Sequence, residues 1–281
     1  MKKIPVKQIT DGSKLSRDVI YTDGDLLIKE GTILKEVYIP LLEQLSIDSV
    51  YIEDDNFNVT EFLISTRNQI ADLKNIIEQY IYNEESNLKP IQKVCDDVIG
   101  NLNANEFDLA ILNEELSLYS HSVQVAYLCG KLSQAINLTE SDMKDLVMAS
   151  LLHDIGLRYI TTPFIGIDFD EMTPAQVFEF KKHTIYGYTA LSKVSWLNED
   201  TLKMILSHHE RIDGSGYPLR QRDQDIKCRI IQAVDAYVCG LTGMETVRKE
   251  SNNIRNSILD YIGGGFDKTV VTKLFEIIDC K

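Results

Sequence analysis

The residues best suited to chemistry in this chain are its five histidines, all of which follow residue 120. One of them, His153, precedes Asp154 at the end of an apolar run, 146–152, which predicts a buried helix. Because burying an unpaired carboxylate is costly, this aspartate calls for an ionic partner or a metal. Imidazole and carboxylate ligands together suit iron, manganese, zinc or nickel better than calcium. For this pair taken alone, a structural hydrogen-bonded couple is the alternative.

Two further segments place candidate ligands on apolar helices. His208 and His209 end one predicted helix and are followed by a glycine-rich turn. Adjacent imidazoles diverge, so this pair could serve two metals. Gly214 and Gly216 permit backbone conformations closed to other residues and let a ligand approach the chain. Asp235 lies within another apolar helix, where a buried acid again calls for a cation.

In order and spacing, these motifs resemble the HD-GYP family, a branch of the HD-domain metal-dependent phosphohydrolases. The resemblance covers about residues 100–281 and implies an all-helical domain that hydrolyses cyclic di-GMP, a bacterial second messenger. The implied products are linear pGpG and, after a second cut, GMP. The motifs are His153-Asp154-Ile155-Gly156, His208-His209-Glu210 and Asp213-Gly214-Ser215-Gly216-Tyr217-Pro218.

Carried over by position, the resemblance implies a metal ligand set that uses every histidine in the chain. Asp154 is the implied bridge between metals and forms the implied catalytic pair with His153. The implied metals are divalent, with iron or manganese favoured and zinc, nickel or magnesium as alternatives. Two such ions clamp a phosphate and lower the pKa of the attacking water. The implied ligands are His121, His153, Asp154, His183, His208, His209 and Asp235.

The implied substrate-binding residues depart from the family pattern. The lysine that usually follows the first motif is replaced by Leu157, and Arg158 is the neighbouring alternative. Of the two basic positions expected after Asp235, the first falls on Glu245 and the second on Arg248. Gly214, Gly216 and Tyr217 complete the implied site. In the family the turn 216–218 also resembles a docking surface for proteins that make cyclic di-GMP, the diguanylate cyclases.

A third metal is not expected. Family members with three metals carry a glutamate four residues before the first histidine, and here that position is Ser117, whose neutral hydroxyl is a poor ligand. All the implied metal ligands are present, whereas some of the implied substrate-binding residues are missing. Three functions therefore stay open. A cyclic di-GMP phosphodiesterase is favoured. The others are a phosphohydrolase of another nucleotide, and a degenerate domain that binds nucleotide or a partner protein without turnover.

The elements that position these residues predict a mostly α protein. Segment 1–58 has short strands near 19–21, 26–28 and 50–52 and a helix near 38–45, which predicts a small α+β domain with a sensory or regulatory role. Segment 59–99 is a predicted helical linker. Segment 100–281 is helical almost throughout, with interruptions at 161–174 and 213–226, and forms the predicted phosphohydrolase domain.

The linker helix has one apolar face. Leu63, Ile70, Leu73, Ile77 and Tyr80 recur at helical spacing, and the polar segment 83–90, which ends in proline, ends the pattern. This face packs on the chain's own domain in the favoured interpretation. The alternative is a homodimer contact through residues 60–82.

The composition narrows the partners. With 29 basic and 43 acidic residues the net charge is −14. A surface of this charge repels nucleic acid, which is therefore not expected as a partner. An anionic substrate would require a local positive centre such as bound metal. No apolar run approaches the roughly 20 residues of a membrane span, so no membrane contact is expected. Five scattered cysteines and the absence of a secretory signal predict reduced thiols and a cytoplasmic location.

Overall fold

The computed structural model divides the chain into two compact units, Met1–Glu61 and Phe62–Lys281, each with its own apolar core. The sensory role predicted for residues 1–58, and the separation of 59–99 from 100–281, stay predictions. The structure describes residues 2–15, 18–20, 26–45, 47, 49–52, 61–83, 87–102, 117–165, 167, 169–244, 251–260 and 264–279.

The first unit is the predicted small α+β fold. Strand β1 (Lys2–Pro5) pairs antiparallel with β4 (Ser49–Ile52), and β2 (Val19–Ile20) pairs antiparallel with β3 (Leu26–Ile28). Short helices η1 (Val6–Gln8), η2 (Glu36–Tyr38) and α1 (Ile39–Gln44) connect them. The predicted strands and helix are therefore confirmed, apart from residue 21, which lies outside the described residues.

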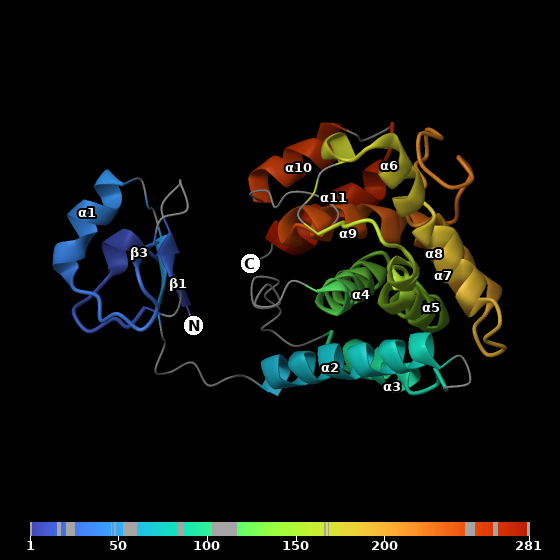
Figure 1. Ribbon diagram of the computed structural model, residues 1–281, viewed down its shortest axis with the longest axis horizontal. Coiled ribbons are helices and arrows are strands. Elements are labelled where there is room, and N and C mark those ends of the chain that lie inside the picture. The colour runs from blue at the N-terminus through green and yellow to red at the C-terminus, as the bar shows by residue number, and fades with distance from the viewer. Residues whose placement is uncertain are drawn as a thin grey trace. The chain divides into compact units, whose positions relative to one another are not determined.

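The second unit is built of helices, which confirms the mostly α fold (Figure 1). The two predicted interruptions are confirmed, because one irregular segment precedes α6 and another joins α8 to α9. Among the described residues, no helix is both long and apolar enough to cross a membrane. The helices are α2 (Glu61–Tyr82), α3 (Ile91–Gly100), α4 (Leu118–Ala135), α5 (Glu140–Leu152), η4 (Ile155–Tyr159), η5 (Phe169–Glu171), α6 (Pro174–Phe180), α7 (His183–Leu191), α8 (Glu199–Ser207), α9 (Ile226–Thr242), α10 (Ser251–Asp260) and α11 (Lys268–Asp279).

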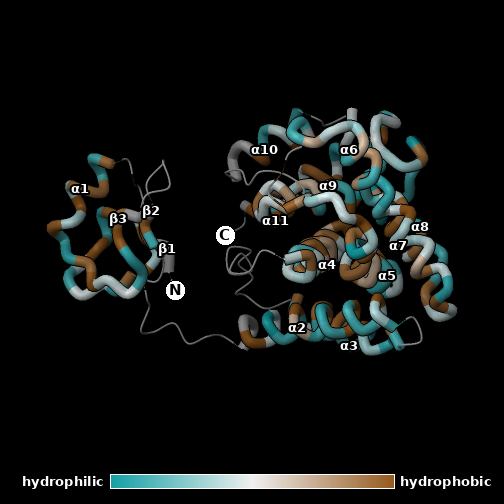
Figure 2. Tube along the Cα trace, in the orientation of Figure 1, coloured by the Kyte–Doolittle hydropathy of each residue, from teal (hydrophilic) through white to brown (hydrophobic). Residues whose placement is uncertain are grey.

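Helix α4 lies at the centre of this unit, where it packs against α5 and α9. It is buried on nearly all sides, as a helix that is apolar all round should be. Helix α2 is instead amphipathic, and Figure 2 shows its polar and apolar residues in alternation. Its apolar face buries Leu73, Ile77 and Tyr80 in the unit's own core. For this face we predicted packing on the chain's own domain, with a dimer contact as the alternative. Its residues Leu73, Ile77 and Tyr80 pack in the core of the second unit.

Several of the helices that carry or precede candidate ligands begin at side-chain caps. The Ser117 hydroxyl accepts a hydrogen bond from the backbone N–H of Ser120, and the Ser120 hydroxyl accepts one from the backbone N–H of Ser117, so that α4 starts with a capping box. Asn198 caps α8 by accepting from the backbone N–H of Thr201, and Asp225 caps α9 by accepting from that of Lys227. Ser117, the position where the family can carry a metal-binding glutamate, thus has a structural role here.

A close approach of η4 and α7 depends on glycine. A Cβ atom built on Gly156 would lie 1.8 Å from the carbonyl oxygen of His183 and 2.7 Å from the backbone nitrogen of Gly187. Both neighbours are backbone atoms, which cannot move away as a flexible side chain would. Gly156 therefore sets the distance between the element that follows Asp154 and the helix that begins with His183.

We predict that Gly156→Ala lowers the free energy of unfolding by about 3 kcal/mol, because the added methyl group forces the two backbones apart. Urea unfolding followed by circular dichroism measures the change. Gly100→Ala is the matched control, since a Cβ at Gly100 meets no atom within 4 Å; it should be neutral or slightly stabilising. Equal effects of the two substitutions would contradict this role for Gly156.

Candidate metal centre

The structure brings together all seven residues that were predicted to bind metal. They come from three helices and from the segments that follow two others. Each residue is at most 7% exposed, so bulk water does not solvate its polar atoms. The residues are His121 on α4, His153 and Asp154 after α5, His183 at the start of α7, His208 and His209 after α8, and Asp235 on α9.

Their ligand atoms form two groups, in each of which all atoms lie within 4.8 Å of one another. The first group contains Asp154, His183, His208 and His209, and the second contains His121, His153 and Asp235. His208 and His209 were considered as ligands of two different metals, whereas here they share one group.

Asp154 connects the two groups because its two oxygens face different histidines. Its Oδ1 lies 3.5 Å from His183 Nε2 and 3.4 Å from His208 Nε2. Its Oδ2 lies 3.6 Å from His121 Nε2 and 3.2 Å from His153 Nε2. Both oxygens are buried without a hydrogen-bond partner, a costly state for a carboxylate. This geometry suits a carboxylate that bridges two cations.

Asp235 closes the second group. Its Oδ1 lies 3.1 Å from His121 Nε2 and 3.6 Å from His153 Nε2, while its Oδ2 lies 3.8 Å from His209 Nδ1. The thiol of Cys239, one helical turn later on α9, donates to the same Oδ1 at 3.3 Å. Helix α9 therefore both supplies this carboxylate and orients it.

Backbone carbonyl groups orient three of the imidazoles. The Nδ1 atoms of His153, His183 and His208 lie 2.7, 2.8 and 2.7 Å from the carbonyl oxygens of Ser150, Phe180 and Ile205. Since a carbonyl only accepts, each Nδ1 carries the proton and each Nε2 presents its lone pair to the centre. Metal-binding histidines are held by this kind of second contact.

The positions of these lone pairs fit a cation. The Nε2 atoms of His183 and His208 are 3.1 Å apart, and those of His121 and His153 are 3.3 Å apart. Two neutral acceptors at that distance repel each other unless a positive charge lies between them. Nitrogen ligands bind metals at about 2.0–2.1 Å, which places neighbouring ligand atoms about 3 Å from one another. The residues present therefore fit a divalent metal centre.

The electrostatics of the centre follow from burial and mutual contact. Burial opposes ionisation of Asp154 and Asp235, yet the adjoining imidazoles hold the pKa of each carboxyl well below its usual range. Burial lowers the pKa of His183 to about 4 and that of His209 well below its usual value. Burial also opposes protonation of His153, but the adjoining Asp154 and Asp235 carboxylates raise its pKa well above the usual value. Two carboxylates among imidazole nitrogens suit a cation.

Glu210 shapes the turn that follows the paired histidines. Its buried carboxylate accepts hydrogen bonds from the backbone N–H groups of Leu219 at 2.5 Å and Gln221 at 2.9 Å. Gly216 packs closely against this segment, since a Cβ there would lie 2.5 Å from Glu210 Cα. The turn is thereby held against the metal centre, and the Tyr217 ring stacks on the His209 ring with a centroid separation of 4.8 Å.

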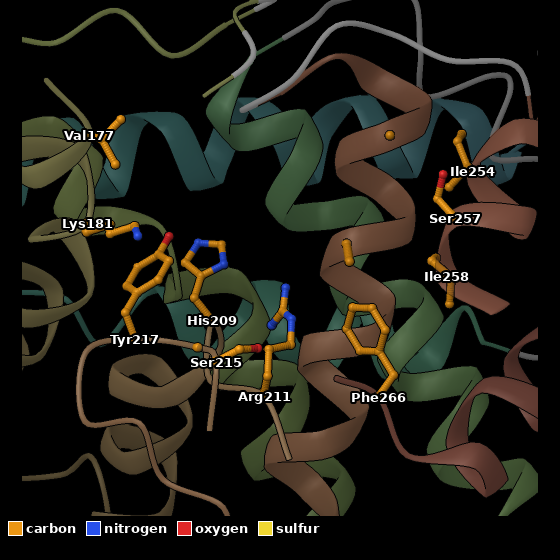
Figure 3. A pocket seen from close by; sticks show the side chains of 13 residues that line it. Val177, Lys181, His209, Arg211, Ser215, Tyr217, Ile254, Ser257, Ile258 and Phe266 are labelled. Atoms are coloured by element: carbon orange, nitrogen blue, oxygen red, sulfur yellow. The ribbon is translucent and has the colours of Figure 1, made fainter. Parts of the chain in front are cut away.

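A cavity of about 430 Å³ opens beside His209 (Figure 3). Of the predicted substrate-binding residues, Gly216 and Tyr217 line it. Gly214, at φ +80°, shapes the turn without being among the lining residues. The remaining lining residues were not predicted: Val177, Lys181, Arg211, Ser215, Ala236, Gly240, Ile254, Ser257, Ile258 and Phe266.

The other predicted substrate contacts lie elsewhere. Arg158 pairs with Glu78 of α2 at 2.8 Å and is not among the residues that line this cavity, while Leu157 is buried in the core. The same Glu78 also accepts a hydrogen bond from Tyr119. Arg248 and Glu245 lie outside the described residues, so their contribution stays a prediction.

Comparison with known proteins agrees with this geometry. The family model described as "HD domain" matches residues 118–238. The chain is 30% identical over 142 residues to a cyclic di-GMP phosphodiesterase of Thermotoga maritima, a match that covers 46% of this chain and 37% of the relative. It is 26% identical over 245 residues to 3′3′-cGAMP-specific phosphodiesterase 2 of Vibrio cholerae, covering 81% of this chain and 45% of the relative. Less than half the length of each relative is thus matched.

A solved structure has a similar fold. The HDG"Y"P protein Bd1817 from Bdellovibrio bacteriovorus superimposes with a TM-score of 0.66 at 19% sequence identity, and the match covers 99% of each chain. At that identity the likeness concerns the fold alone.

We predict that Mn²⁺ raises the melting temperature of the metal-depleted protein. Free metal at about 100 times its dissociation constant stabilises the folded state by about 2.7 kcal/mol, which corresponds to roughly 5–10 °C for a unit of this size. Differential scanning calorimetry measures the shift. Asp154→Asn should abolish most of it, and Asp223→Asn, which replaces an exposed aspartate, should retain it. An unchanged melting temperature in the wild-type protein would contradict a metal centre.

Proposed function

We infer the function of this chain from its family, because it carries an HD domain of the HD-GYP type. We propose that it is a metal-dependent phosphodiesterase that hydrolyses cyclic di-GMP to linear pGpG and, by a second cut, to GMP. Several relatives bear the name cyclic di-GMP phosphodiesterase, including those of Thermotoga maritima and Borreliella burgdorferi. Their names support the substrate class, and the metal centre supports the reaction class.

One observation carries the proposal: Asp154 is buried between two groups of ligands and directs one oxygen towards each. A single cation would leave the second group without charge compensation. We therefore propose two divalent metals, held by the seven predicted ligands, with Asp154 as their bridge. Ser117 supports two metals rather than three, because its hydroxyl is engaged in capping α4. Iron or manganese suits the nitrogen and oxygen ligands.

When bound, such metals polarise a phosphate and lower the pKa of an attacking water. The protein side chains hold the centre in place through the carbonyl contacts of His153, His183 and His208. Tyr217 stacks on His209, and both rings line the cavity, so the stacking holds the His209 imidazole in its orientation. The cavity beside His209 is where the substrate binds in this proposal.

A second candidate substrate is 3′3′-cGAMP. The relative that matches the largest part of this chain among those compared above bears that specificity in its name. The two cyclic dinucleotides share the same phosphodiester ring, so one centre could cleave either. A degenerate domain that binds nucleotide without turnover is the remaining alternative, but the complete ligand set supports activity.

The proposed partners beyond the substrate stay predictions. Docking of a diguanylate cyclase at Gly216-Tyr217-Pro218 would use a turn whose glycine is buried and whose tyrosine packs on His209. These contacts support a role of the turn in the site itself. The cytoplasmic location and a homodimer through residues 60–82 likewise stay predictions.

We predict that the protein loaded with Mn²⁺ or Fe²⁺ under anaerobic conditions converts cyclic di-GMP to pGpG, followed by chromatography. Asp154→Asn should reduce kcat/KM by about 10²-fold or more, because even residues that only support a metal ligand contribute 10–100-fold. The control Asp223→Asn should keep wild-type activity. A metal-loaded wild-type protein that leaves both cyclic di-GMP and 3′3′-cGAMP intact would contradict the proposed function.

A further inference from the structure

The cavity beside His209 has a charge opposite to that of the protein. The chain carries a net charge of −14, yet none of the described residues that line this cavity is acidic. Two lining residues, Lys181 and Arg211, are cationic. Its volume of about 430 Å³ falls within the range of about 300–1,000 Å³ that small-molecule sites occupy. The cavity is therefore suited to an anionic small molecule.

Lys181 lies in the two-residue link between α6 and α7, just before His183. Its Nζ is 5.2 Å from the centroid of the Tyr217 ring, a distance typical of a cation–π contact. Tyr217 in turn stacks on His209. The ammonium group is thereby held near the metal centre while its side chain stays exposed to incoming ligand.

Arg211 lies on the other side of His209. Its Nη1 donates a hydrogen bond to the carbonyl oxygen of Glu210 at 2.7 Å, and its guanidinium carbon is 4.6 Å from the centroid of the Phe266 ring. Figure 3 shows the side chains in the order Lys181, Tyr217, His209, Arg211 and Phe266 across the view. The two cations thus flank the imidazole that faces the cavity.

The far wall of the cavity is apolar. Ile254 and Ile258 of α10 and Phe266, which precedes α11, line it, together with Gly240 of α9. An aromatic face beside aliphatic side chains accepts a planar heterocycle, and base stacking on such a face is tolerant of sequence. Cations near the metals and an apolar wall beyond them match the two parts of a nucleotide, its phosphate and its base.

We propose that Lys181 and Arg211 contact the phosphates of the cyclic dinucleotide and that the wall formed by Ile254, Ile258 and Phe266 receives one of its bases. This assignment rests on the proposed function and specifies which residues determine substrate affinity. Lys181 and Arg211 would supply the positive charge that is missing because Leu157 stands where the family usually has a lysine. They do so from different elements of the fold. Neither residue is a ligand in the two metal groups, so both act on substrate rather than on metal binding.

The test is steady-state kinetics of the metal-loaded full chain with cyclic di-GMP. Lys181→Gln should raise KM about tenfold with little change in kcat, since one charge-assisted contact is lost. Lys181→Arg, which keeps the charge, should recover most of the loss. Lys182→Gln is the matched control, because the Nζ of this adjacent lysine lies over the Phe178 ring and the residue does not line the cavity. The dependence of KM on salt concentration should weaken in Lys181→Gln but not in the control Lys182→Gln.

Arg211→Gln should likewise raise KM, while its metal content and melting temperature report whether the turn and His209 have stayed in place. Phe266→Leu, which keeps an apolar side chain, should weaken binding of the product pGpG less than Arg211→Gln does. An active wild-type protein with the same KM in Lys181→Gln and Lys182→Gln would overturn the inference and leave the proposed function intact. A wild-type protein that neither binds nor cleaves cyclic dinucleotides would overturn both, and that result is seen before any variant is made.

Discussion

The structure of the helical unit depends on how it accommodates the carboxylate of Asp154. This group is 1% exposed, has no hydrogen-bond donor to either oxygen, and is surrounded by four Nε2 atoms at 3.2–3.6 Å. A buried charge of this kind is tolerated only next to positive charge. Backbone carbonyls accept a hydrogen bond from the outer nitrogen of three imidazoles, so the inner nitrogens face the place where a cation would compensate this charge.

This requirement explains why the ligands come from so many elements. Helices α4, α5, α7, α8 and α9 each end or pass at the centre, and each is held there by contacts that have no direct part in metal binding. Gly156 lets η4 approach α7, and Gln232 of α9 donates to the Ser207 carbonyl at the end of α8. The energetic penalty of bringing polar atoms together is thus offset by the apolar packing of the helices that carry them.

The cluster of candidate metal ligands could be predicted from the sequence because His153-Asp154, His208-His209 and Asp235 lie on or at the ends of apolar helices, and the family resemblance added His121 and His183. The cavity could not, because its lining comes from α6, α9, α10 and the segment before α11, and no local pattern links Lys181 to Phe266. Arg158 illustrates the same limit. Its position beside the first motif suggested substrate contact, but the docking of α2 places Glu78, 80 residues away in the chain, within 2.8 Å of its guanidinium. The apolar face of α2 was predicted, whereas its docking site was not.

The most direct test of this account is the anomalous diffraction of a crystal of the manganese- or iron-loaded protein, recorded on both sides of the metal absorption edge. The account predicts two peaks, one on each side of the Asp154 carboxylate and about 3.5–4 Å apart, as in other two-metal sites. One should contact His183, His208 and His209, and the other His121, His153 and Asp235. A single peak, or peaks that do not contact Asp154, would contradict the bridging role on which the proposed chemistry depends.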